Sequence, residues 1–149
     1  LRDLAAYWQQ LDPAPVVPHR QQFNPVEVPQ CLRNIILLDV GPGCPRYLIR
    51  LAGSTVNPVY QKSITGEFLE NILNEQDRPK IIAQYDYSVA YQIPTYMADT
   101  VDVRSGKSLE YERVILPLTS DEETTDKLLV GIHFFDVRQH VIDRPIFKL

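Results

Sequence analysis

The amino-acid sequence predicts an α+β domain: a five-stranded antiparallel sheet with helices on one face and an N-terminal helix on the other. Three observations support this fold class. An apolar helical stripe opens the chain, a helical stretch divides five strand-like segments into two and three, and the last strand is apolar on both sides. Strands grouped in this way favour an antiparallel sheet, because a parallel sheet needs strands and helices to alternate.

Length and composition indicate one globular domain. The chain has 149 residues and is 44% hydrophobic, which is typical of a packed protein. Its longest strongly apolar runs, 35–38 and 128–132, are far shorter than the ~20 residues that cross a bilayer. Residues 1–11 lack the apolar core of a secretory signal.

Charge and cysteine content narrow the partners and the compartment. The net charge is −4 and the basic residues are scattered, which argues against nucleic acid as a partner. Cys31 and Cys44 do not form a CxxC pair, and a small secreted scaffold would carry more cysteines. We therefore expect both thiols to be reduced and the protein to be cytoplasmic.

The first predicted element is a helix over residues 1–11. Asp12-Pro13 ends it, because the residue before a proline is pushed out of the helical region. After a proline-rich connection, Asn24 is expected to cap a short turn that starts at Pro25. The apolar stripe of the first helix recurs at i, i+3, i+4, i+7 and i+10 and consists of Leu1, Leu4, Ala5, Trp8 and Leu11.

Residues 35–40 and 46–52 are predicted to form a hairpin around a Gly/Pro-rich turn. Gly53 follows, and we expect it to adopt a backbone angle that only glycine tolerates cheaply. Short helical turns are predicted at 56–60 and 67–73, the second capped by Thr65.

A longer helix is predicted at 78–91, followed by strands at 95–103, 109–118 and 127–137. A half-exposed strand would alternate apolar and polar residues, but the last strand does not. Both faces of the sheet should therefore be covered, one by the helical insert and the other by the first helix. One face of the long helix carries Ile81, Ile82, Tyr85 and Val89. The two faces of the last strand carry Leu128, Val130, Ile132 and Phe134, and Leu129, His133, Phe135 and Val137.

This order of elements, with these residues, resembles a PAS domain, and more narrowly a family of stand-alone PAS proteins known mainly from alphaproteobacteria. The chain departs from that family at 61–63, where Gln-Lys-Ser replaces Gly-x-Asp, and at Gly53-Ser54, where the family has Gly-Thr. The matching segments are 4–8 in the opening helix, 24–29 in the following turn, 36–40 and 47–54 in the first strands, Thr65-Gly66, and 111–118 in the fourth strand.

The resemblance implies a single PAS-like domain over residues 1–149, with an N-terminal helix at 1–12, a PAS core at about 34–137 and a C-terminal tail at 138–149. It also implies a non-catalytic, bacterial sensory or signalling domain, because PAS domains sense ligands, redox state or light and pass the signal to partners. It identifies neither a cofactor nor a ligand, and both stay unknown.

Five residues are candidates for ligand binding. Tyrosine combines a flat apolar body with a polar tip, which suits a small-molecule pocket, and the helical insert faces the sheet. A charge inside a strand needs a partner, and for Arg50 this is either Asp39 or Glu112 in an ion pair or an acidic ligand. The candidates are Arg50, Tyr60, Tyr85, Val89 and His133.

A homodimer through the first helix is also predicted. Trp8 is typical of an interface anchor on a short terminal helix, and an uncovered apolar patch of this width would be unusual on a monomer. In a monomer the helix would instead lie on its own sheet. The proposed interface residues are Leu1, Leu4, Trp8 and Leu11.

Two other functions stay open at this point. One is a protein-interaction adaptor with a filled core. The other is an enzyme of the ketosteroid-isomerase type, in which Tyr85 and Asp99 or Asp102 would meet in an apolar pocket. Two strands before the long helix argue against that enzyme. No HxxH, HExxH or CxxC spacing indicates a metal, no Asn-Cys-Arg-Phe-Leu-Gln run indicates a flavin, and His19 and His140 are expected to be solvated.

Overall fold

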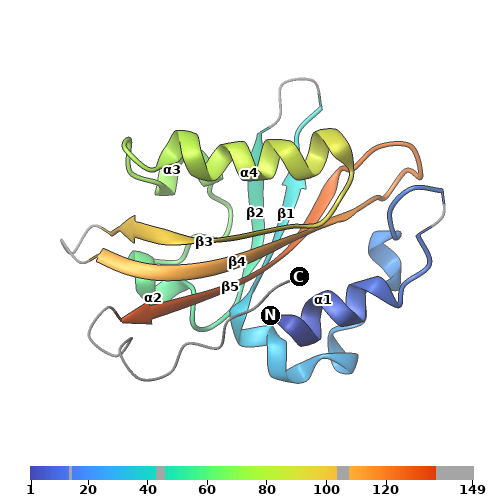
Figure 1. Ribbon diagram of the computed structural model, residues 1–149, viewed down its shortest axis with the longest axis horizontal. Helices are drawn as coiled ribbons and strands as arrows, with labels where there is room; N and C mark the ends of the chain where they lie inside the picture. Colours follow the sequence, from blue (N-terminus) through green and yellow to red (C-terminus); the bar gives the residue numbers. More distant parts are fainter. Residues whose placement is uncertain (14, 43–45, 104–107, 137–149) are drawn as a thin grey trace.

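The computed structural model describes residues 1–13, 15–42, 46–103 and 108–136. Its strands form one antiparallel sheet in the spatial order β2-β1-β5-β4-β3 (Figure 1). The hairpin that precedes the helical insert therefore lies at one side of the sheet, and the strands that follow it lie at the other. The strands are β1 (Ile35–Val40), β2 (Tyr47–Ala52), β3 (Thr95–Asp102), β4 (Ser108–Leu118) and β5 (Lys127–Asp136).

Helices cover both faces of this sheet, as the sequence predicts. One face, called the inner face below, packs against the helical insert of α2 (Asn57–Tyr60), α3 (Leu69–Ile72) and α4 (Arg78–Tyr91). The opposite, outer face packs against α1 (Arg2–Gln9) and the segment that follows it (Figure 1). That segment holds the 3₁₀ helices η1 (Arg20–Gln22), η2 (Pro25–Glu27) and η3 (Pro29–Asn34).

Strand β5 lies at the centre of the sheet. It pairs with β1 on one side and with β4 on the other. Its apolar residues divide as predicted, since Leu128, Val130 and Ile132 belong to the inner core and Leu129 to the outer core. Residues 128–132 are buried on both faces and leave no position for solvent, which explains why this part of β5 does not alternate in polarity.

The chain closes its outer face with its own α1. Leu4 is 1% exposed, and the indole Nε1 of Trp8 donates to the carbonyl of Pro117, 2.9 Å away. Gly131 of β5 lets the helix approach, because a Cβ there would lie 2.9 Å from a methyl of Leu4. This is the arrangement expected for a monomer, and a homodimer through Leu1, Leu4, Trp8 and Leu11 stays a prediction.

Gly53 is needed for a reason that the sequence did not predict. Its φ is not positive, and among the described glycines only Gly66 has a left-handed backbone, with φ 86°. A Cβ on Gly53 would instead lie 2.5 Å from the carbonyl carbon of Arg33 and 2.5 Å from the carbonyl oxygen of Leu32. The prediction of a special backbone angle was wrong; the close passage of η3 is what excludes a side chain.

Other local predictions are confirmed or corrected at single residues. Asn24 caps η2, and its Oδ1 accepts from the backbone N–H of Val26 at 3.2 Å. Thr65 does not cap α3, whose N-cap is Phe68 without a side-chain bond. Helix α4 has the predicted bounds but buries the polar Gln84 and Ser88 beside Ile81 and Tyr85, while Ile82 and Val89 are only partly buried.

Candidate ligand site on the inner face

The five predicted ligand residues do not converge on one site. Tyr60, Tyr85 and Val89 lie on the inner face, in or against the inner core. Arg50 and His133 border pockets on the outer face, so the sheet separates them from the tyrosines. Only the inner group can form part of a single site.

Arg50 forms an exposed ion pair. Its Nε lies 2.5 Å from Oδ2 of Asp39, one of the two predicted partners, and 63% of the Arg50 side chain is exposed. Asp39 also pairs with Lys127 at 2.7 Å, and although burial opposes it, these two cations lower the pKa of the Asp39 carboxyl. The predicted ion pair with Asp39 therefore forms, but it is exposed, and an exposed pair contributes only about 1 kcal/mol or less.

His133 lies half-exposed on the outer face, with Nδ1 3.9 Å from Oε1 of Glu112. It borders a small pocket of about 120 Å³ that Cys31 and Leu4 also line. Burial raises the pKa of the Cys31 thiol, which keeps it protonated and makes it a poor nucleophile or metal ligand. His19 is not simply solvated, because its Nδ1 accepts from the N–H of Gln21 and caps η1.

Neither a metal site nor the predicted enzyme dyad forms in the part of the chain that the structure describes. No group of three His, Cys, Asp or Glu residues gathers there, and Cys44 and His140 lie outside it. Asp99 pairs with Lys80 at 2.8 Å, and Asp102 accepts from the hydroxyl of Ser108 at 2.5 Å. Neither carboxylate bonds to Tyr85, so the isomerase arrangement is wrong for this structure.

An open pocket of about 350 Å³ lies on the inner side, between α2, α3, the first turn of α4 and the end of β3. Its lining combines apolar side chains with a few polar groups, which is the usual composition of a small-molecule site. The apolar lining residues are Tyr60, Ile72, Leu73, Val101 and Val103.

Arg78 is the notable polar group of this inner pocket. Its Nη2 donates to the carbonyl of Leu73 at 3.1 Å, which turns the side chain back along the end of α3. Its Nε is sealed from solvent and has no hydrogen-bond partner. Leaving a buried donor without an acceptor costs about 1–3 kcal/mol, and because Nε is sealed, the Arg78 side chain would have to move before a ligand could supply the acceptor.

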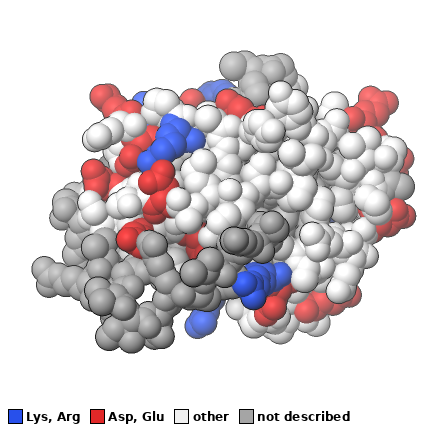
Figure 2. Space-filling view, in the orientation of Figure 1, with Lys and Arg blue, Asp and Glu red and all other residues white. Residues whose placement is uncertain are grey.

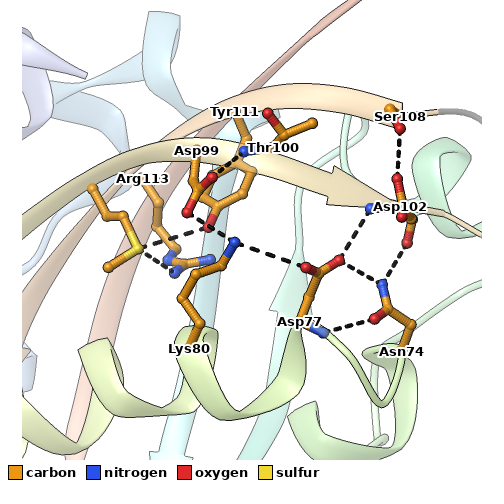
Figure 3. Close-up of polar contacts among 10 residues, drawn as sticks. Asn74, Asp77, Lys80, Asp99, Thr100, Asp102, Ser108, Tyr111 and Arg113 are labelled. Atoms are coloured by element: carbon orange, nitrogen blue, oxygen red, sulfur yellow. Dashed lines mark hydrogen bonds and ion pairs between the residues drawn. The ribbon is translucent and has the colours of Figure 1, made fainter.

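A hydrogen-bonded clamp holds the rim of the inner pocket in place (Figure 3). The side-chain amide of Asn74 donates to Oδ2 of Asp77 and to the carbonyl of Asp102, at 2.7 Å each. The same Oδ2 accepts from the N–H of Asp102 at 3.1 Å. Although burial opposes it, these donors lower the pKa of the Asp77 carboxyl. The clamp ties the start of α4 to the end of β3.

Behind the inner pocket lies a buried, positively charged side chain. Arg113 of β4 is 3% exposed, and Figure 3 shows it beside Tyr111 on the side of the sheet that faces α4. Its Nε and Nη2 donate to Oε1 of Gln84 at 2.9 and 2.6 Å. Its Cζ lies 5.2 Å from the ring centre of Tyr85 and 5.0 Å from that of Tyr111.

Tyr60 links the inner pocket to this interior. It lines the pocket, while its hydroxyl interacts electrostatically with Tyr85, Arg113 and Tyr111. Burial raises the pKa of the Tyr60 phenol, so it stays protonated and can donate a hydrogen bond. Its ring meets Phe134 edge-on at 6.3 Å.

Sequence reasoning selected Tyr60 and Tyr85 as candidates and overlooked Arg78 and Arg113. A signal for Arg113 was available, because Tyr111, Arg113 and Ile115 share one face of a strand at a spacing of two residues. A cation between two apolar residues on a covered face is as informative as the one noticed at Arg50. Arg78 could not be found this way, because the first residue of a helix normally reaches solvent.

Comparisons with known proteins agree with this architecture. A family model described as a PAS domain matches residues 1–133. No curated protein matches the chain significantly. Among the described residues, no helix is long and apolar enough to cross a membrane.

Solved structures of similar shape are photoreceptor and kinase domains. The dark structure of the blue-light photoreceptor Aureochrome1 LOV has a TM-score of 0.59 at 12% identity, covering 78% of this chain and 86% of that chain. The Rhodobacter sphaeroides LOV protein has a TM-score of 0.56 at 11% identity, covering 72% and 61%. A sensory box sensor histidine kinase from Vibrio cholerae has a TM-score of 0.52 at 10% identity, covering 75% and 89%. At these identities, the likeness shows the fold.

Proposed function

The chain belongs to the PAS domain family, and from this premise we propose that it is a sensory domain that binds a small molecule in the inner pocket beside Tyr60. PAS domains act in sensing and signalling, so the question for this chain is what it senses. One observation carries the proposal. It is the open pocket of about 350 Å³, whose lining combines apolar side chains with polar groups, Arg78 among them.

The dimensions and lining of the inner pocket support a small ligand. About 350 Å³ falls at the lower end of the range of small-molecule sites. Val101 and Leu73 supply apolar surface, and Asn71 and Lys62 supply polar groups. A ligand bound here would contact α3, α4 and β3 together. Its binding could therefore change the position of the helical insert relative to the sheet.

Native mass spectrometry of the protein purified from its own cells tests the proposal. We expect a small molecule to remain bound to the wild-type protein. Asn71 is an exposed residue of the lining, and Asn71→Trp should fill the pocket and remove that mass without disturbing the core. The control is Ala90→Trp at an exposed position of α4 away from the pocket lining, which should retain the ligand. An unliganded wild type, or a ligand retained equally by Asn71→Trp, contradicts the proposal.

A second candidate function, an adaptor that docks a protein partner, rests on exposed aromatic residues of α4. The ring centres of Tyr87 and Tyr91 lie 4.5 Å apart with the rings tilted by 42°, and the residues are 51% and 64% exposed, while Ile93 is 40% exposed. Figure 2 shows a broad area of uncharged side chains on this side of the molecule. Crosslinking in cells should lose a specific partner with Tyr91→Asp but keep it with Asn71→Trp if docking is the function.

The homodimer through α1 is a separate proposal about assembly. Because Leu4 is already buried within one chain, α1 would have to leave its own sheet to present the full stripe to a partner. Sedimentation of the wild type and Trp8→Glu at several micromolar concentrations tests it. A monomeric wild type, or a folded Trp8→Glu protein that still dimerises, contradicts an α1 interface.

A further inference from the structure

Arg113 brings a charge into the interior without a carboxylate to balance it. The residue is 3% exposed, and among the described residues no carboxylate lies within ion-pair distance of its guanidinium. Asp99 interacts with it electrostatically but is held by Lys80 at 2.8 Å (Figure 3). Contacts with two tyrosine rings and one neutral amide stabilise a cation, but they do not neutralise it.

The polar atoms around Arg113 border a space that water can reach. In the described part of the chain, the sealed polar side-chain atoms without a partner are Arg78 Nε and Thr125 Oγ1. Arg113 Nη1 and the hydroxyls of Tyr60 and Tyr85 also form no hydrogen bond with a described residue, yet they are not among the sealed atoms. An unpartnered atom that is not sealed must face a gap at least as large as a water molecule.

Three elements bring these polar groups together. Tyr60 comes from α2, Tyr85 from α4 and Arg113 from β4, and the phenol of Tyr60 lies close enough to the other two for their charges to act on it. Because Tyr60 also lines the inner pocket, a turn of its side chain would connect the pocket to the interior. The residue after it, Gln61, ends α2 with a positive φ of 56°, which breaks the helix at this point.

We propose that Arg113 binds the carboxylate of a small monocarboxylic acid that enters through the inner pocket, with the hydroxyls of Tyr60 and Tyr85 as further donors. This inference rests on the proposed ligand-binding function and names the class of ligand. The apolar body of the acid lies in the inner pocket along Ile72 and Val101.

Charge balance and the geometry of the hydrogen-bond donors favour a monocarboxylate as the ligand. One buried cation is neutralised by one negative charge, whereas a doubly charged phosphate would leave an uncompensated anion in the core. Gln84 occupies the edge of the guanidinium formed by Nε and Nη2, so Nη1 is the donor left for a ligand. Two phenols that stay protonated provide donors for the second carboxylate oxygen.

Gln84→Glu is the sharpest variant, because it provides an internal carboxylate in place of the ligand's. The amide oxygen already lies 2.6 Å from Nη2, so the new carboxylate can pair with Arg113, while the Thr95 hydroxyl, which accepts from the Gln84 amide at 3.2 Å, would turn to donate instead. The variant should fold at least as well as the wild type and should lose affinity for the acid by about tenfold or more, the effect of losing one hydrogen-bonded charge pair. Gln21→Glu on the exposed η1 carries the same charge change and serves as the control.

The experiment compares acids with their own amides. Straight-chain acids from acetate to decanoate, with benzoate and phenylacetate, are added at millimolar concentration, each beside its neutral amide. Binding is read from the Arg113 Nε–H signal in nitrogen-15 NMR, assigned by its loss in Arg113→Met, and from the melting temperature. We expect at least one acid, and not its amide, to shift this signal and raise the melting temperature in the wild type and in Gln21→Glu but not in Gln84→Glu.

Two results overturn the inference, and they are distinct from failure of the proposed function. If no acid acts more strongly than its amide, or if Gln84→Glu responds like the wild type, Arg113 does not bind a carboxylate. A neutral molecule that co-purifies with both the wild type and Gln84→Glu would retain the ligand-binding function while removing its acidic specificity. If Arg113→Met does not fold, the Gln84→Glu comparison still decides.

Discussion

The two faces of the sheet are covered in different ways. On the outer face, α1 covers the sheet and packs its apolar side chains against β4 and β5. Trp8 fixes the helix with one hydrogen bond to Pro117. On the inner face, α4 meets the sheet through buried polar groups, with Gln84 on Arg113 and Ser88 on Thr95, whose hydroxyl oxygens lie 2.5 Å apart.

The difference indicates which face carries the function. An apolar interface gains free energy from burial alone and needs no further partner. A buried polar interface is stable only when its groups are satisfied, and the inner face leaves Arg78 Nε, Arg113 Nη1 and the Tyr85 hydroxyl without partners among the described residues. Under the proposed function, the outer face is a structural closure and the inner face is the side that a ligand would complete.

The largest expected effect is at Gly53, where a segment that covers the outer face passes the start of the inner insert. Gly53→Ala would place a Cβ 2.5 Å from the backbone of Arg33, and backbone cannot move aside as a side chain can. We expect a loss of about 3 kcal/mol or more in the free energy of unfolding, measured by chemical denaturation. Gly66→Ala is the control, because its open surroundings leave only the cost of a positive φ, about 1–2 kcal/mol. Equal losses in the free energy of unfolding for Gly53→Ala and Gly66→Ala would contradict the close approach of Arg33 to Gly53.

The next effect tests the apolar closure of the outer face. Leu4→Ala removes a side chain that is 1% exposed and leaves a cavity between α1 and β5, so unfolding should become easier by about 3 kcal/mol. Denaturant titration monitored by Trp8 fluorescence measures the change. A loss below about 1 kcal/mol would mean that α1 is not closely packed on its own sheet, and would favour a helix that is free to bind a partner.

The polar rim of the inner pocket should respond to acid. The pKa of the Asp77 carboxyl is lowered in the folded state from its ordinary value of 3.8, so the unfolded chain binds the proton more readily. The stabilisation from Asp77 is therefore complete above about pH 4 and is lost as the pH falls through the lower, native pKa. Asp77→Asn should cost about 1 kcal/mol at pH 7 and converge with the wild type in strong acid. If the free energies of unfolding of the wild type and Asp77→Asn differed by the same amount at every pH, the clamp would be contradicted.

The smallest effect should be at Tyr85. This prediction compares a hydroxyl that lacks a hydrogen bond with one that has a hydrogen bond on the same face of the sheet. Tyr85→Phe removes a hydroxyl without a hydrogen-bond partner among the described residues, and we expect a change below about 0.5 kcal/mol. Tyr47→Phe removes a hydroxyl that donates to Asp86 at 2.5 Å, and should cost about 1.5 kcal/mol or more. A Tyr85→Phe loss as large as that of Tyr47→Phe would mean that the Tyr85 hydroxyl is already bonded.

Periodicity and proline placement predicted most of the fold but little of the site. The strands were found because apolar runs bounded by turns are local signals, and the bounds of α4 follow from its pattern and its early proline. Gly53 was misread because its constraint comes from Arg33, a neighbour that only the folded chain brings close. The exposure of the Arg50–Asp39 pair could not be predicted, because a strand position alone does not show that β2 lies at the edge of the sheet.

The central claim, that the inner face is the ligand-binding side, is tested most directly by a crystal structure of the protein purified from its own cells without unfolding. We predict electron density for an organic molecule in the inner pocket, with an acidic group directed past Tyr60 toward Arg113. Density instead in the outer pocket beside Cys31, or an inner pocket filled by the protein's own side chains, would contradict it.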